Sequence, residues 1–86
     1  MQKILMFTMA GCPYCRRAHG WMDELLVEHP EYRQIPITIV DETMRPDLAN
    51  QYDYYYVPTY YVGDRKVHEG AATKERVAAV YESAMA

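Results

Sequence analysis

The sequence has little of what marks several specialised classes of protein. It contains no apolar run of the roughly 18 residues needed to cross a membrane, so no membrane association is expected. Its 12 acidic residues outnumber its 9 basic ones, and the net charge of −3 argues against a nucleic-acid partner. The N-terminal segment "MQKILMFTMAGC" is too short for a signal-peptide core and a cleavage site, so a cytoplasmic location is expected.

Cysteine is also scarce, and the two cysteines present, Cys12 and Cys15, lie close together. Small secreted domains usually carry more cysteines, which are spaced to cross-link distant loops. A disulfide between residues three apart closes almost no loop and would therefore add little stability. The pair is expected to serve chemistry rather than folding.

What the chain does have is an ordinary globular composition. Half of its 86 residues are hydrophobic and 24% are charged, and it contains no internal repeat, low-complexity segment or linker. These features predict a single domain over residues 1–86, which we expect to act as a monomer.

Hydrophobic periodicity and turn residues predict seven helices and strands. Strands are expected over Lys3–Thr8, Gln34–Val40, Thr59–Val62 and Lys66–Glu69, and helices over Pro13–Glu28, Arg45–Tyr52 and Thr73–Met85. The first two strands are expected to be buried and the last to lie at an edge, after a hairpin turn at Gly63–Lys66. The order β-α-β-α-β-β-α predicts an α/β fold, in which a four-stranded mixed sheet has helices on both faces and its first two strands run parallel.

The expected core follows from stripes of apolar residues at three- and four-residue spacing on the first and last long helices. Their members are Ala18, Trp21, Met22, Leu25 and Leu26, and Val77, Val80, Tyr81 and Ala84. Tyr60 and Tyr61 alternate along a central strand, so they are expected to pack on opposite faces of the sheet. Tyr52, at the end of the short helix, is also expected to pack inward.

The segment "GCPYC" follows the first strand and opens the first helix. Pro13 suits the first helical position, which puts Cys12 at the helix N-terminus, where free N–H groups and the helix dipole favour a thiolate. Cys15 lies one turn later on the same side, where it should be more buried and keep a higher thiol pKa. Such a pair suits two-step exchange: Cys12 attacks a substrate disulfide, and Cys15 then displaces the reduced substrate.

Two other interpretations of the cysteines remain open. They could be inert core residues, although a position between a strand and a helix favours a redox site. Together with His19 they also form the pattern C-x₂-C-x₃-H, which offers three soft metal ligands. A structural zinc site needs four ligands, and no further cysteine is available, so His19 is expected to be an exposed helix residue.

A second informative pattern is "VPT", which leads into the third strand. Proline is unusual at the entry to a buried strand because it cannot donate a hydrogen bond to the sheet. If the Val57–Pro58 bond is cis, the N–H and C=O of Val57 are left free. They could then pair with an extended substrate like one rung of a β-ladder.

Taken together, the strand, "CPYC", helix, "VPT", hairpin and final helix resemble the thioredoxin superfamily, and "GCPYC" is similar to the active site of dithiol glutaredoxins. The resemblance covers almost the whole chain. It implies a thioredoxin-like fold and reduction of protein disulfides or glutathione mixed disulfides, with Cys12 as nucleophile, Cys15 as resolving thiol and Pro58 as a cis-proline. The residues expected to contact substrate are Pro13, Tyr14, Tyr56, Val57, Pro58 and Gly70.

The expected glutathione-binding rim differs from that of glutaredoxins. Met9 stands where they usually carry Lys or Arg, and Glu69 replaces the first Gly of a Gly-Gly pair, where it is expected to repel an anion. The segment "EGAATKERV" looks more like the corresponding end of thioredoxins. No tightly bound cofactor is expected, and the electron source is either glutathione, as a co-substrate, or thioredoxin reductase. A metal or iron–sulfur carrier that uses Cys12 is a further alternative, against which Pro13 argues.

Tyrosine is abundant, with nine in the chain, and Tyr54, Tyr55 and Tyr56 form a run just before Pro58. This loop is expected on the active-site side of the fold. Tyr14 and Tyr56 are predicted to form an apolar platform, able to donate hydrogen bonds, for a disulfide-bearing protein or peptide. The alternative, that the loop tyrosines only cap the edge of the sheet, remains open.

Overall fold

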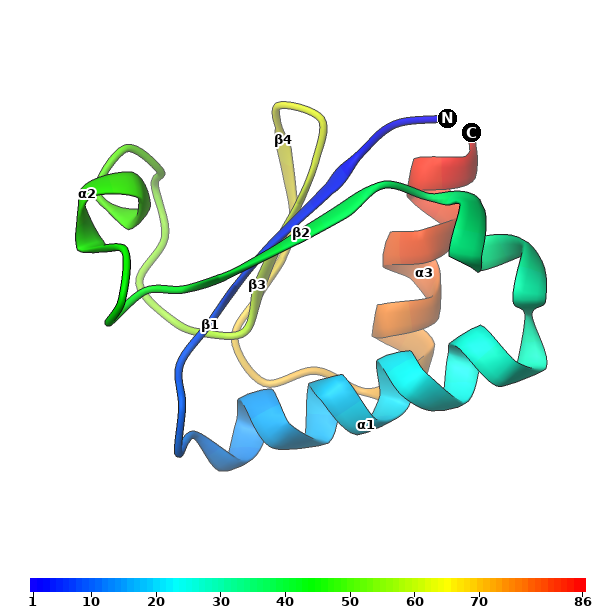
Figure 1. Ribbon diagram of the computed structural model, residues 1–86, viewed down its shortest axis with the longest axis horizontal. Helices are drawn as coiled ribbons and strands as arrows, with labels where there is room; N and C mark the ends of the chain where they lie inside the picture. Colours follow the sequence, from blue (N-terminus) through cyan, green and yellow to red (C-terminus); the bar gives the residue numbers. More distant parts are fainter.

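The computed structural model describes all residues from 1 to 86, and its centre is a four-stranded sheet (Figure 1). The strands are β1 (Ile4–Thr8), β2 (Ile37–Asp41), β3 (Thr59–Val62) and β4 (Arg65–Glu69), in the spatial order β2-β1-β3-β4. β1 and β2 run parallel, whereas β3 is antiparallel to both β1 and β4. The predicted mixed sheet and its parallel first pair are confirmed.

The two long helices, α1 (Pro13–Glu28) and α3 (Lys74–Met85), pack against one face of the sheet, and the single turn α2 (Pro46–Ala49) packs against the other. Figure 1 shows α2 set apart at the opposite end of the molecule from α3, so it covers only one end of its face. The two chain termini lie side by side. None of the helices combines the length and the apolar character that crossing a membrane requires.

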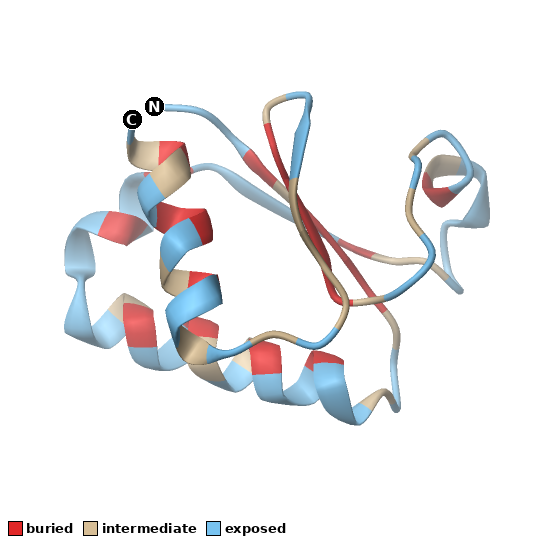
Figure 2. Ribbon diagram, turned by 180° about the vertical axis from the view of Figure 1, so that it is seen from behind, coloured by how far each residue is buried: buried red, intermediate tan, exposed pale blue.

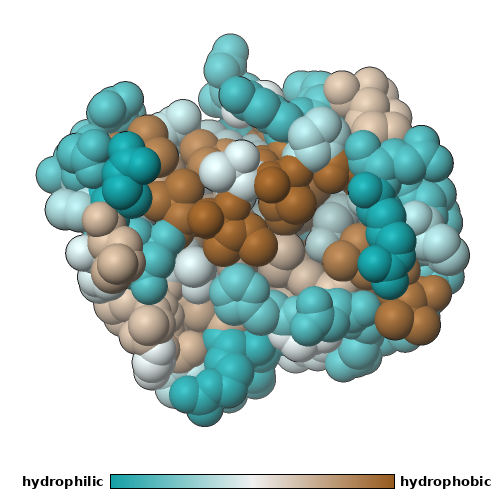
Figure 3. Space-filling model, viewed as in Figure 1, coloured by the Kyte–Doolittle hydropathy of each residue, from teal (hydrophilic) through white to brown (hydrophobic).

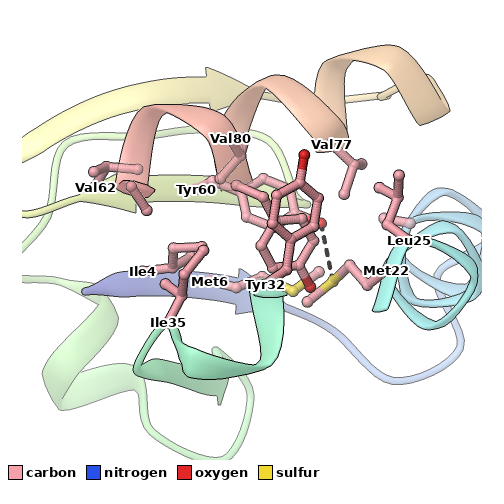
Figure 4. Close-up of a cluster of buried hydrophobic side chains, with 13 residues drawn as sticks. Ile4, Met6, Met22, Leu25, Tyr32, Ile35, Tyr60, Val62, Val77 and Val80 are labelled. Atoms are coloured by element: carbon pink, nitrogen blue, oxygen red, sulfur yellow. Dashed lines mark hydrogen bonds between the residues drawn. The ribbon is translucent and has the colours of Figure 1, made fainter. Parts of the chain in front are cut away.

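The larger core fills the space between the sheet and the two long helices (Figure 4). It contains the inward-facing residues of both predicted helix stripes together with residues of β1 and β3, and Trp21 and Leu26 pack at its margin. Inside it, the Tyr60 hydroxyl donates to Met22 Sδ at 3.3 Å, and the rings of Tyr32 and Tyr81 stack with centroids 4.8 Å apart. Figure 2 shows the buried residues concentrated on the central strands and at intervals along α1 and α3.

A smaller core lies on the other face of the sheet, beneath α2. It consists of Phe7, Val40, Ala49 and Tyr61, with Tyr52 and Tyr54 among the partly buried residues packed against it. Tyr60 and Tyr61 therefore point to opposite faces, and Tyr52 packs inward, as the sequence predicted.

The prediction for the second strand was wrong in its bounds and in its burial. Residues Pro30–Gln34 form a 3₁₀ turn, η1, and β2 begins only at Ile37. β2 is an edge strand in which Val40 alone is buried, and Ile37 and Ile39 are 38% and 48% exposed. Hydrophobic side chains show on this side of the molecule (Figure 3). A run of β-branched residues favours a strand but does not distinguish an edge from a centre.

Four other boundaries differ from the predictions, of which the smallest difference is that β1 starts at Ile4 rather than at Lys3. β4 starts at Arg65, so the hairpin turn is only Gly63–Asp64, where Gly63 adopts a φ of 59° that favours glycine. α2 is one turn rather than the longer helix expected over Arg45–Tyr52. Thr73 is the N-cap of α3 and not part of it, because its side chain accepts a hydrogen bond from the Arg76 N–H at 3.1 Å.

Candidate active site

Cys12 lies where the loop after β1 meets α1. Gly11 adopts a φ of 81°, which turns the chain, and Cys12 is the N-cap with extended backbone angles. Its carbonyl accepts the Arg16 N–H at 3.0 Å, and the exposed Pro13 is the first helical residue. The Cys12 side chain is therefore half-buried at the end of the helix where N–H groups are unpaired.

The two thiols occupy different environments. Hydrogen bonding from the Cys15 N–H is the main cause that lowers the pKa of the Cys12 thiol, aided by the Cys15 side chain, the Tyr14 N–H and the charge of Arg17. Cys15 is only 2% exposed, and burial raises the pKa of its thiol, with a smaller contribution from the neighbouring Cys12. This contrast is the one expected from the sequence.

A pocket of about 300 Å³ opens beside the two thiols. Its lining residues come from the end of β1, the following loop, the first turns of α1 and the end of β2: Thr8, Met9, Ala10, Gly11, Cys12, Cys15, Arg16, His19 and Asp41. His19 was predicted to be exposed, which is wrong: it is half-buried, and its Nε2 lies 3.2 Å from Thr8 Oγ1. The helix period brings His19 under Cys15, one turn further along the same face.

Pro58 enters β3 at the same end of the sheet as the cysteine loop. The bond between Val57 and Pro58 is cis, as the resemblance implied. In the β1–β3 register Phe7 pairs with Thr59, so Pro58 lies level with the end of β1, from which the cysteine loop departs. Neither the N–H nor the C=O of Val57 has a hydrogen-bond partner within the chain.

The fold family can now be assigned. The family model of the glutathione S-transferase N-terminal domain matches residues 6–82, from β1 into α3. The chain belongs to this family. It is a glutaredoxin-like protein of the thioredoxin superfamily, as the sequence motifs predicted. No curated protein matches the chain.

Solved structures with the same fold cover 96% of this glutaredoxin-like chain. They include oxidised thioredoxin from Plasmodium falciparum (19% identity, TM-score 0.75, 80% of that chain) and a malarial protein (17%, 0.72, 96%). A thioredoxin-like protein from Clostridium perfringens is similar too (27%, 0.68, 70%). The predicted thioredoxin-like fold is confirmed, and it is a fold of thiol-based redox proteins.

The tyrosines before Pro58 divide into one packed and two exposed residues. Tyr54 stacks on Phe7 with ring centroids 4.8 Å apart, and its hydroxyl donates to Glu42 at 2.7 Å. Tyr55 and Tyr56 are 86% and 70% exposed. At the cysteine loop, Tyr14 is also exposed and the Arg17 guanidinium lies over its ring. Tyr54 is thus part of the smaller core rather than of the exposed surface.

Gly70 supports the loop that carries these tyrosines. Its φ of 90° favours glycine, and its N–H donates to the Pro58 carbonyl at 2.9 Å. A side chain at this position would meet Tyr56 Cβ at 3.7 Å. Gly70 therefore lies beside the backbone of the cis-proline segment, and its contact with substrate stays a prediction.

Glu69, the last residue of β4, contacts the loop of Tyr54, Tyr55 and Tyr56, although the sequence suggested only that it would repel an anion. Its carboxylate accepts the N–H groups of Tyr55 and Tyr56 at 2.5 and 3.0 Å, and it pairs with Lys66 Nζ at 2.7 Å. The bond from Lys66, followed by the two backbone bonds, lowers the pKa of Glu69 to about 2. Its charge is therefore already paired, and it ties the tyrosine loop to β4.

Substituting Glu69 should change how stability depends on pH. A carboxylate whose pKa is lower when folded contributes stability above its unfolded pKa and loses it as pH falls through the folded value. With an ordinary value of 4.5 and a folded value of about 2, that loss falls between pH 4.5 and 2. Glu69→Gln should therefore destabilise the protein most above pH 5, and urea unfolding from pH 7 to 2 should show the two curves converging. Parallel curves would contradict the assigned contacts.

The three-ligand pattern of Cys12, Cys15 and His19 finds no support in the geometry. No three His, Cys, Asp or Glu side chains converge in an arrangement that could hold a metal ion. Asp41, the one carboxylate that lines the pocket, accepts hydrogen bonds from the Ala10 N–H at 3.2 Å and from the Thr43 N–H at 2.8 Å.

Proposed function

We propose that the chain is a dithiol thiol–disulfide oxidoreductase that reduces protein disulfides or glutathione mixed disulfides through Cys12 and Cys15. The observation that carries this proposal is the contrast between the thiols. Cys12 is accessible at the α1 N-terminus with a lowered pKa, and Cys15 is buried three residues later with a raised pKa. Disulfide exchange needs a thiolate to attack first and a second thiol within reach to resolve the product.

The reaction has two exchange steps. The Cys12 thiolate attacks one sulfur of the substrate disulfide, the sulfur–sulfur bond breaks, and the other substrate sulfur leaves as a thiolate. Cys15, once deprotonated, then attacks Cys12 Sγ and displaces the second substrate sulfur. Two electrons pass to the substrate, and a thiol reductant must later return the resulting Cys12–Cys15 disulfide to the dithiol.

The segment before Pro58 supports a peptide-like substrate. Because the N–H and C=O of Val57 have no partner within the chain, they are free to pair with an extended substrate backbone. Pro13 and Tyr14 on one side and Tyr56 on the other offer exposed surface to its side chains. We further propose that the protein works as a cytoplasmic monomer, without a tightly bound cofactor.

Two reductants are compatible with this site. Glutathione is favoured by the name of the matching family, and the charge of Glu69 is already paired with Lys66. Thioredoxin reductase is favoured by Met9, which supplies no cation for a glutathione carboxylate. The second candidate function is therefore that of a redoxin whose Cys12–Cys15 disulfide is reduced by thioredoxin reductase and which donates electrons to another reductase.

The experiment that tests the function is a coupled disulfide-reduction assay with two electron sources. One contains NADPH, glutathione and glutathione reductase, and the other contains NADPH and thioredoxin reductase, with Cys12→Ser protein as the blank. Turnover with glutathione would establish a glutaredoxin, and turnover only with thioredoxin reductase would establish the second candidate. Absence of turnover above the blank in both would reject the proposal.

Tyr56, one of the two exposed tyrosines before Pro58, should affect substrate binding more than chemistry. If Tyr56 forms the platform with Tyr14, Tyr56→Ala should raise KM for a protein disulfide by roughly tenfold, the loss of about 1.4 kcal/mol, and leave kcat nearly unchanged. Tyr55→Ala is the matched control, because Tyr55 is the neighbouring tyrosine of the same loop and is still more exposed. Unchanged KM with every substrate tried would remove the platform.

A further inference from the structure

The resolving step poses a problem that the two cysteines do not solve by themselves. Cys15 must lose its proton before it can attack, yet burial favours its protonated form. Formation of the mixed disulfide removes the negative charge on Cys12, so its contribution to holding Cys15 protonated disappears. Burial, the larger contribution, remains, and a group that accepts the proton is therefore required.

Two titratable side chains other than the cysteines and Arg16 line the pocket beside Cys15, namely His19 and Asp41. Hydrogen bonds from the Thr43 side chain and backbone, with a weaker one from the Ala10 N–H, lower the pKa of Asp41. Its carboxylate is therefore a weak base whose oxygens are already occupied. His19 differs, because a neutral imidazole has one ring nitrogen that can accept a proton.

Thr8 connects the buried thiol to this imidazole. It is the last residue of β1, is only 8% exposed, and its Oγ1 lies 3.2 Å from His19 Nε2. Thr8 and Cys15 line the same pocket, and hydrogen bonding from the Thr8 hydroxyl to the Cys15 thiolate lowers the pKa of that thiol, against the larger effect of burial. Cys15 and His19 are four residues apart on α1, so their side chains lie on the same face of the helix, and both line the pocket together with Thr8.

We propose that Thr8 and His19 form the proton path that activates Cys15 for the resolving step. As the Cys15 S–H proton passes to Thr8 Oγ1, the Thr8 hydroxyl proton passes to the neutral His19 Nε2, which leaves a thiolate and an imidazolium. The electron pair on sulfur then forms the bond to Cys12 Sγ, and the bond from Cys12 to substrate breaks. The imidazolium returns its proton to the departing thiolate or to water through the open pocket.

This inference rests on the proposed function and assigns to it two residues beyond the cysteines. Thr8 contacts the reacting sulfur, whereas His19 acts through Thr8. A purely structural role would affect both exchange steps alike, because Cys12 and Cys15 belong to the same turn of α1. A proton path affects only the second step, so the two roles can be separated.

The test is a stopped-flow reaction of the reduced protein with 5,5′-dithiobis(2-nitrobenzoate). Attack by Cys12 releases one coloured thiolate, and resolution by Cys15 releases a second, so each step is observed separately. Thr8→Val and His19→Gln should slow the second release by roughly 10²-fold, the usual contribution of general-base catalysis, and leave the first within about twofold. Thr8→Ser retains the hydroxyl and should resolve at close to the wild-type rate.

Chemical rescue gives a second readout. His19→Ala opens space in the pocket, so added imidazole should accelerate its second release, but should not accelerate that of Thr8→Val. Second releases within about twofold of wild type in both Thr8→Val and His19→Gln would overturn the proton path, as would equal slowing of both steps. Wild-type protein that releases no second thiolate would instead overturn the dithiol function itself. The His19 variants alter a half-buried side chain and test the path even if Thr8→Val fails to fold.

Discussion

Cys12→Ser is expected to reduce disulfide turnover to the background rate, whereas Cys15→Ser should still attack substrate and accumulate as a mixed disulfide. The reason is the different position of the two thiols. Only Cys12 combines access to solvent with the helix N-terminus and a lowered thiol pKa, and a serine hydroxyl is not ionised there. Cys15 is buried and meets substrate only through Cys12. Intact-mass spectrometry of each variant after reaction with a peptide disulfide measures the trapped adduct.

The same variants show whether the order of attack is correct. Trapping on Cys15 in the Cys12→Ser protein would reverse the assigned roles, and the absence of any adduct on Cys15→Ser would mean that Cys12 is not a nucleophile. A useful control is the rate at which iodoacetamide alkylates Cys12 at pH 7. Cys15→Ser should alkylate at a similar but not identical rate, because the Cys15 N–H remains while its side-chain hydrogen bond changes.

The parts of the site that are local in sequence could be predicted from it. Pro13 marks the start of α1, and the helix period then fixes the relation between Cys12 and Cys15, including the burial of the second. The apolar stripes of α1 and α3 likewise identified the helix face that meets the sheet, because a helix must bury such a face.

The parts that depend on contacts between distant segments could not be predicted in this way. His19 was interpreted as exposed because nothing in its own helix shows that it reaches Thr8, eleven residues earlier. The role of Glu69 depends on a loop that folds back to bring the Tyr55 N–H, fourteen residues away, to its carboxylate. A charged residue gives no sequence signal for such a bond. The signal available in both cases was the position of a polar residue near a motif: His19 lies four residues after Cys15, and Glu69 directly precedes Gly70.

The edge position of β2 illustrates the same limit for the fold. The residues Ile37–Val40 show high strand propensity, and the βαβ unit places this strand beside β1. Neither feature shows whether another strand pairs with the far side of β2. Which strand becomes the edge is decided by where β3 inserts, on the other side of β1. That choice involves pairing between residues more than fifty positions apart, such as Ile4 with Val62.

The largest effect on stability is expected at Phe7, because it joins the sheet to the loop that carries the substrate contacts. Its side chain is fully buried, and its ring lies 5.1 Å from Tyr52 and 4.8 Å from Tyr54 between ring centroids. Phe7→Ala should lower the free energy of unfolding by about 3–5 kcal/mol, the usual cost of removing a buried ring and leaving a cavity. Domains are commonly stable by about 5–15 kcal/mol, so the variant should be marginal.

Leu5→Ala is the matched control, because Leu5 lies on the same strand and face but is only partly buried beside the same cluster. It should cost clearly less than Phe7→Ala in urea unfolding. A Phe7→Leu variant keeps a hydrophobic side chain and should recover part of the loss, while remaining folded enough for kinetics. Since Tyr54 and Tyr52 hold the loop through this ring, Phe7→Leu should raise KM for protein disulfides without slowing alkylation of Cys12. Equal costs for Phe7→Ala and Leu5→Ala would mean that the smaller core does not anchor the tyrosine loop.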